Sequence, residues 1–227
     1  MSLEITEYRL RFGRPLVPSE ATHLRGFFGH VCADEPLLHH HRQDGRLLYD
    51  YPRVQFKVLD RVAHLIGIAE GGAIVEQLWR QVDAARLGAE ELPVLEGTLG
   101  RRREPFGEVE QSISYRFCSP WLALNQENHR RYEAFPGAAD RQALLERILI
   151  GNCLALAKSF CHRVAARLTA DAGGLRPARV RLKGVSMLGF RGTFRINFAL
   201  PGHIGIGKSV SRGFGTVESL GQGVESC

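Results

Sequence analysis

The chain has 227 residues, of which 44% are hydrophobic and 24% charged, a composition that excludes a wholly disordered protein. No apolar run approaches the roughly 20 residues that cross a bilayer, and the N-terminus lacks the apolar segment of a signal peptide. Five cysteines, odd in number and never in a C-x-x-C pair, argue against a disulfide framework and a zinc knuckle. We therefore expect a cytoplasmic protein with no membrane partner, no metal ion and no cofactor.

The excess positive charge lies at the C-terminal end. Residues 1–175 hold 22 Lys and Arg against 22 Asp and Glu, whereas residues 176–227 hold eight against two. The same last segment contains ten of the 25 glycines. A basic, glycine-rich segment favours a polyanionic partner such as a phosphate backbone. A solvated basic surface is the alternative.

The first half has the pattern of one small α+β unit. In chain order, apolar periodicity predicts a strand at 8–12, a helix that begins near an N-cap at Ser19, strands at 54–58 and 63–69, a helix at 74–82 and a strand at 93–99. This order of strand, helix, strand, strand, helix, strand is that of a ferredoxin-like domain. We assign it to residues 1–100.

The second half repeats this order after a candidate linker at residues 100–105. It predicts a strand at 113–117, helices at 125–135 and 140–168, strands at 180–182 and 194–200, a glycine-rich loop and a last strand at 214–220. The predicted fold class is α+β, with two tandem ferredoxin-like (βαββαβ) domains. The second domain, residues 106–227, has its last helix replaced by the glycine-rich loop.

Residues 202–209, GHIGIGKS, match the P-loop pattern G-x-x-x-x-G-K-[ST] letter for letter. A P-loop needs a helix whose N-terminus receives the phosphates, and the following residues, VSRGFG, do not begin one. Only 18 residues follow Ser209, which is too few to complete a nucleoside-triphosphatase fold. The sequence therefore argues against nucleotide hydrolysis.

The same loop fits an RNA-binding role better. Its glycines allow tight turns that bring backbone N–H groups close to an anion, while lysine, arginine and serine side chains add charge and hydroxyl donors. An aromatic residue between two glycines stacks on a base or, more often, fills a core. Together with two arginines of the preceding basic strand, the candidate RNA-binding residues are Gly205, Gly207, Lys208, Ser209, Ser211, Arg212, Gly213, Phe214, Gly215, Arg191 and Arg195.

In this position, the pattern Gly-x-Gly-x5-Gly-Phe-Gly resembles the hallmark of the repeat-associated mysterious proteins of CRISPR systems. Further segments resemble the CRISPR-associated endoribonucleases that process precursor guide RNA. These are residues 37–58 with LLHHH, DG and YPRVQFKV, 66–71 (IGIAEG), 120–125 (PWLALN) with Asn128 and Tyr132, and 144–152 (LLERILIGN). The resemblance covers roughly residues 20 to 220.

Histidines at positions 39, 40 and 41 are the candidate catalytic residues. Histidine serves as acid or base near neutral pH, and residues i and i+2 of an extended loop point the same way. The resembled subgroup carries His-x-His here, which implies His39 and His41 as the acid and base. Metal binding and solvated loop residues are the alternatives. Candidates for catalytic support are His40, Tyr49, Tyr51 and Lys57. For Lys57, a solvated surface lysine is the commoner explanation. We interpret His30 as a structural residue.

The resemblance implies a metal-independent endoribonuclease that binds CRISPR repeat RNA. In that chemistry a 2′-hydroxyl attacks the adjacent phosphate and leaves a 2′,3′-cyclic phosphate and a 5′-hydroxyl. The alternative is a non-catalytic RNA-binding paralogue that holds guide RNA in an interference complex. Other CRISPR-associated proteins and a second copy of the chain, in a homodimer, are further candidate partners.

Overall fold

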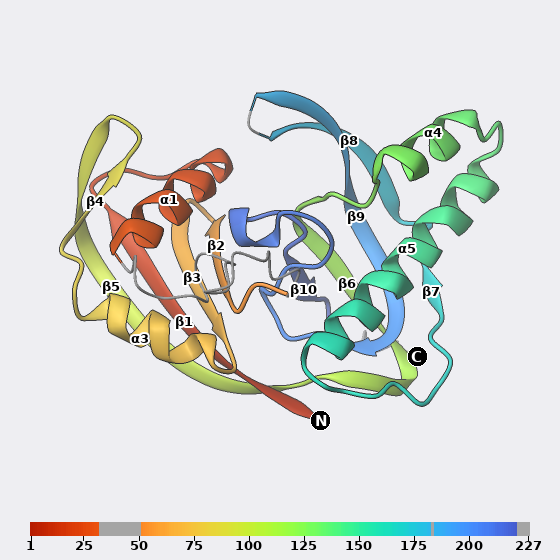
Figure 1. The fold of residues 1–227 in the computed structure, drawn as a ribbon, viewed down its shortest axis with the longest axis horizontal. Helices are drawn as coiled ribbons and strands as arrows, with labels where there is room; N and C mark the ends of the chain where they lie inside the picture. Colours follow the sequence, from red (N-terminus) through yellow and green to blue (C-terminus); the bar gives the residue numbers. More distant parts are fainter. Residues whose placement is uncertain (32–50, 183, 222–227) are drawn as a thin grey trace, which may run out of the picture. The chain divides into compact units, whose positions relative to one another are not determined.

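The computed structural model describes residues 1–31, 51–182 and 184–221 (Figure 1). These residues form two compact units, each described here by itself. The N-terminal unit comprises residues 2–104 and the short segment Ser209–Gly213. The C-terminal unit comprises residue 1, residues 105–208 and the residues from 214 onward. None of the described helices is long and apolar enough to cross a lipid bilayer.

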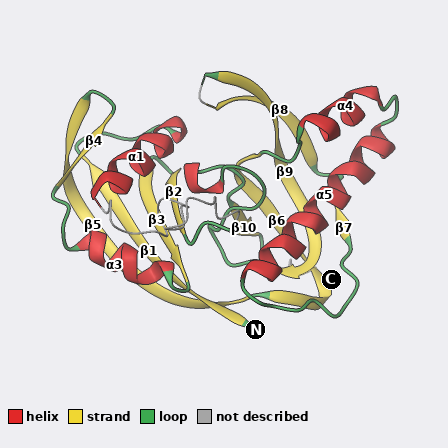
Figure 2. Ribbon diagram, in the orientation of Figure 1, coloured by secondary structure: helices red, strands yellow, loops and turns green. Residues whose placement is uncertain are grey.

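The N-terminal unit is a five-stranded antiparallel sheet with two helices packed on one face (Figure 2). Its elements are β1 (Ser2–Phe12), α1 (Ala21–Val31), β2 (Val54–Leu59), β3 (Val62–Ile68), α3 (Gly71–Trp79), β4 (Ala84–Leu87) and β5 (Glu90–Pro105). The strand order is β2-β3-β1-β5-β4. Apart from the edge strand β4, this is the ferredoxin-like order, so the predicted fold of this half is confirmed.

The core lies between the helices and one face of this sheet. Tyr8, Leu10 and Phe12 alternate along β1 and are buried, as their period of two predicts. Phe28 of α1 stacks on Phe56 of β2 with ring centroids 5.8 Å apart. The apolar stripe of α1 therefore meets the apolar face of the sheet.

In this half, two local expectations were wrong and one strand was missed. Ser19 is not the cap of α1: it lies inside a short 3-10 turn, η1 (Pro18–Glu20), whose entry is stabilised by the Glu20 carboxylate accepting the Val17 N–H at 2.8 Å. Strand β4 was not predicted. The candidate linker at 100–105 is instead the end of the long strand β5.

The C-terminal unit has a second mixed sheet-and-helix arrangement. Its elements are β6 (Gly107–Trp121), α4 (Gln126–Ala134), α5 (Ala138–Ser159), β7 (Ala170–Asp171), β8 (Leu175–Leu182), β9 (Val185–Ala199) and β10 (Val217–Ser219). The sheet order is β10-β6-β9-β7, and β8 pairs with another stretch of the same edge of β9. Strands β10, β6, β9 and β8 repeat the ferredoxin-like order, and the tandem fold is confirmed.

The helix α5 ends at Ser159, nine residues before the predicted end at Leu168. The chain turns at Cys161, which has a φ of 53°, in the left-handed region. His162 then contacts the Glu108 carboxylate of β6 at 2.6 Å. This tertiary contact outweighs the helical periodicity of the following residues.

Candidate nucleic-acid interface

The glycine-rich loop between β9 and β10 is held in place by backbone hydrogen bonds. The Ile206 N–H donates to the Gly215 carbonyl at 2.9 Å, and the Gly215 N–H donates to the Pro120 carbonyl at 2.9 Å. The Lys208 N–H donates to the Leu122 carbonyl at 3.3 Å. These three amides are therefore bonded within the protein, and an anion at these positions would have to be bound by side chains.

Two glycines of the loop lie where no other residue fits. Gly207 has a φ of +87°, and a Cβ there would lie 2.5 Å from the Trp121 Nε1 atom. That indole N–H donates to the Asn152 Oδ1 atom at 3.0 Å. Gly215 has a φ of +63°, and a Cβ there would lie 2.0 Å from the Ile206 carbonyl oxygen. Both glycines therefore serve close packing.

The Lys208 side chain is anchored in the same unit. Its ammonium group donates to the Leu124 carbonyl at 2.8 Å. Partial burial lowers the pKa of this ammonium group. The residue as a whole is exposed, so the cation remains accessible from solvent.

The tip of the loop, Ser209–Gly213, belongs to the N-terminal unit. It contains a 3-10 turn, η2 (Val210–Arg212), that packs against β2 and α1. Gly213 has a φ of +86°, and a Cβ there would lie 2.9 Å from the Ala21 Cβ and 3.2 Å from the Phe56 carbonyl oxygen. Between Ala199 and Val217 the chain forms this turn and no α-helix, which is consistent with rejecting the P-loop.

This packing brings two arginines together. Arg212 precedes Gly213, and Arg25 lies one helical turn after Ala21, on the same face of α1. Burial and then the charge of Arg212 lower the pKa of the Arg25 guanidinium. Neither arginine has an ion-pair partner among the described residues. Two cations without a described carboxylate partner attract an anion, which makes this pair a candidate anion site.

Arg25 was missed by the sequence analysis. It follows Leu24 in an amphipathic helix and has the spacing of an ordinary solvated helix residue. Its neighbour Arg212 is 187 positions away in the sequence, and only the fold brings them together. No sequence pattern could have identified this pair.

The predicted Arg191 and Arg195 lie on the open face of the C-terminal sheet. Both are exposed and alternate with buried core residues along β9. Arg176 is the cross-strand partner of Arg191, and Arg116 is that of Thr193, so four arginines share this face. Among the described residues, Arg116 is paired with Glu218 at 2.6 Å, whereas Arg191 and Arg195 have no ion-pair partner.

The hairpin of β8 and β9 carries further positive charge. Arg179 and Arg181 are exposed on the face opposite to Arg176. The sequence from 172 to 217 contains no Asp or Glu. This strand pair is therefore a two-sided cationic surface.

Lys57 lies in a place that the sequence did not indicate. It is fully buried in β2, so its interpretation as a solvated lysine is wrong. It shares the sheet face opposite the core with its cross-strand partner His64. The His64 Nδ1 atom contacts the Glu7 carboxylate at 2.7 Å, and Arg102 donates to the same carboxylate at 2.6 Å. This face of the N-terminal sheet thus carries a buried lysine and a buried glutamate, and the glutamate is contacted by His64 and by the half-buried Arg102.

Four of the other predicted site residues lie outside the described residues: His39, His40, His41 and Tyr49. Tyr51, just before β2, and Phe214 are half-buried. The loop-tip residues Ser209, Ser211, Arg212 and Gly213 are in the N-terminal unit with Tyr51 and Lys57, whereas Gly205, Gly207, Lys208, Phe214, Gly215, Arg191 and Arg195 are in the C-terminal unit.

Comparison with known families identifies both halves of the chain. The sequence model of the Cas6b N-terminal domain matches residues 1–105, and that of the Cas6b C-terminal domain matches residues 107–220. The two matches together leave few residues unassigned.

Known relatives agree with this assignment. A solved structure described as Cas6b shares 33% identity, with a TM-score of 0.89 over 97% of this chain and 100% of the other. A second, described as CRISPR RNA processing endoribonuclease Cas6b, shares 32% identity, with a TM-score of 0.78 over the same shares. An uncharacterized protein of Methanocaldococcus jannaschii is 39% identical over 124 residues, which cover 55% of this chain and 84% of the relative.

The packing of the loop glycines predicts a stability difference. Gly207→Ala combines left-handed backbone strain with a steric clash against Trp121, so we expect it to lower the free energy of unfolding by about 2–4 kcal/mol. Gly184→Ala is the control, because Gly184 has a φ of +80° but open space around its Cβ position. It should cost only about 1–2 kcal/mol. Urea denaturation measures both, and equal losses would contradict the steric role.

Proposed function

This chain belongs to the Cas6b family and is a CRISPR RNA processing endoribonuclease, and we propose that it cleaves repeat RNA without a metal ion, leaving a 2′,3′-cyclic phosphate and a 5′-hydroxyl. The match of both Cas6b domains carries the proposal. The cationic surfaces described above support it, because an RNA backbone needs positive charge wherever it is bound. Association with other CRISPR-associated proteins and dimerization stay predictions from the sequence.

We assign phosphate binding to the Arg25–Arg212 pair. Two guanidinium groups without a carboxylate partner in the described part of the chain can each donate hydrogen bonds to one phosphate, and a charge-assisted hydrogen bond is stronger than a neutral one. The Arg191 and Arg195 side chains and the β8–β9 hairpin offer further contacts to the backbone. Lys208, held by the Leu124 carbonyl, supplies another cation at the base of the loop.

The proposed chemistry rests on His39 and His41. One imidazole removes the proton of the attacking 2′-hydroxyl, and the other protonates the leaving 5′ oxygen. The segment that carries them begins where α1 ends, at Val31, and leads to β2, which begins at Val54. The loop tip packs against both of these elements, so the Arg25–Arg212 pair lies in the unit from which the histidine segment emerges. Tyr51 and Lys57 remain candidates for support.

Replacing the histidines tests the assignment of acid and base. We expect His39→Ala or His41→Ala to reduce the rate of single-turnover cleavage by on the order of 10²–10⁴, because each change removes one proton transfer. His40→Ala should be milder. RNA affinity should survive in all three variants, and the rate of the unaltered enzyme should follow a bell-shaped pH profile around neutrality.

His129→Ala, at an exposed position on α4, is the matched control for losing one imidazole. A larger defect in His40→Ala than in its neighbours would mean that a different pair acts. Normal cleavage by all three variants would move the base to Tyr49, Tyr51 or Lys57. Tight binding of repeat RNA by the unaltered protein with no cleavage would establish the RNA-binding paralogue instead.

Metal removal tests the mechanism separately. Because two histidines supply both proton transfers, we expect the cleavage rate to be unchanged in excess EDTA. The measurement is the time course of product formation on the host's own repeat RNA, with and without the chelator. Loss of cleavage in EDTA that added magnesium restores would rule out this mechanism.

The Arg25–Arg212 pair makes a prediction about affinity. If both guanidinium groups bind one phosphate, either Arg25→Ala or Arg212→Ala should weaken RNA binding roughly tenfold. Each should reduce the slope of log affinity against log salt by about 1. The double variant should lose less than the sum of the two, because the contacts share one partner.

Arg80→Ala is the matched control, since Arg80 is an exposed arginine of the same unit. Lys208→Ala tests the loop base and should also lower the slope. Additive losses in the double variant would indicate two separate phosphates, and an unchanged slope in both single variants would show that the pair is structural.

A further inference from the structure

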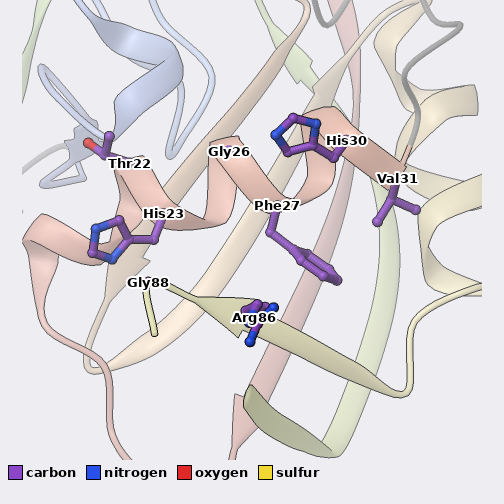
Figure 3. A pocket seen from close by; sticks show the side chains of 8 residues that line it. All are labelled: Thr22, His23, Gly26, Phe27, His30, Val31, Arg86 and Gly88. Carbon is purple, nitrogen blue, oxygen red and sulfur yellow. The ribbon is translucent and has the colours of Figure 1, made fainter. Parts of the chain in front are cut away.

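A cavity of about 490 Å³ lies on the outer side of α1, next to the edge strand β4, within the N-terminal unit (Figure 3). His23, Phe27 and His30 line it from α1, at the i, i+4 and i+7 positions of one helix face. Arg86 lines it from β4, and Figure 3 shows the Phe27 side chain pointing from α1 to the side of the helix on which Arg86 lies. None of the residues used for cleavage or phosphate binding above is part of it.

The side chains that line the cavity favour a ligand with an aromatic ring, which would contact Phe27, and a negative charge, which would contact Arg86. Phe27 is half-buried: it packs against the core and also faces the cavity. Arg86 is exposed and has no ion-pair partner among the described residues, although its cross-strand partner is Glu91. The nearby Glu20 carboxylate is bonded to Arg14 at 2.7 Å. No described Asp or Glu lines the cavity.

Gly26, in the middle of α1, also lines the cavity, and no described residue requires a glycine there. It is exposed, and a Cβ at this position would have no atom of another described residue within 4 Å. Glycine destabilises a helix interior relative to alanine. Its φ is not in the left-handed region, and no described neighbour needs the space. Among the described residues, nothing occupies the space beside Gly26 at the cavity.

We propose that this cavity binds a single-stranded nucleotide of the RNA that flanks the repeat. The base would stack on Phe27 above Gly26, and Arg86 would bind the phosphate, with His23 and His30 at the two ends. Stacking on an aromatic side chain requires an unpaired base and tolerates any sequence, as a flanking segment demands. The identity of the ligand as substrate RNA rests on the proposed function; the cavity and its chemistry do not.

Gly26→Ala separates a binding role from a structural one. We expect it to raise the melting temperature by roughly 1–4 °C, since alanine is the better helix former, while lowering affinity for a fluorescent single-stranded oligouridylate about fivefold or more. Gly151→Ala is the matched control: Gly151 is an exposed glycine of α5 with equally open space. It should raise the melting temperature similarly and leave affinity unchanged.

Two further variants and a crosslink complete the test. Phe27→Leu, which keeps the apolar volume, and Arg86→Ala should lower oligouridylate affinity about fivefold or more, whereas Arg80→Ala should have a smaller effect. Photocrosslinking of the unaltered protein to an oligouridylate containing 4-thiouridine should place adducts in the α1 peptide. This second measurement remains valid even if Phe27→Leu disturbs the fold.

The outcomes are distinct. Adducts confined to other peptides, or unchanged affinity in Gly26→Ala and Phe27→Leu, would overturn the proposal while leaving repeat cleavage intact. Competition by a peptide but not by RNA would identify a protein-binding cavity and also overturn it. If the chain does not cut repeat RNA but the oligouridylate crosslinks to α1, the proposed function falls and the nucleotide site stands.

Discussion

The close approach of the loop tip to α1 and β2 is the contact on which the candidate site depends. Gly213 has a left-handed backbone, and any Cβ there would lie 2.9 Å from that of Ala21. Only glycine allows the backbone to come this close to α1, and this close approach places Arg212 near Arg25. Like charges close together disfavour the folded state unless an anion lies between them. A phosphate bound between them, as proposed, would offset this repulsion.

In the structure, two glycines of the loop serve close packing. The pattern Gly-x-Gly-x5-Gly-Phe-Gly suggested backbone amides presented to an anion. Gly207 instead makes room for the Trp121 indole, and Gly215 for the Ile206 carbonyl. The motif describes a loop that folds back tightly on the end of β6. Anion binding by this loop, as proposed, would therefore fall to the side chains of the residues between the glycines.

Periodicity predicted most of the elements and failed where a tertiary contact outweighed it. The alternation of Tyr8, Leu10 and Phe12 predicted β1 because one face of the strand is buried. The end of α5 was placed too late because the following apolar residues keep a helical spacing, while the Glu108 contact to His162 turns the chain away. The arginine-rich end of β5 has no apolar alternation, so a strand there could not be distinguished from a linker.

The site was predictable to the extent that its residues are contiguous. Arg212 was identified because it lies within a motif, whereas Arg25 became visible only when the fold placed it beside the loop tip. The same contact links the two halves of the proposed mechanism. Both elements that border residues 32–50, α1 and β2, pack against η2 in one compact unit. A phosphate bound by the arginine pair, as proposed, would therefore be held by the two elements that precede and follow the histidine segment in the sequence.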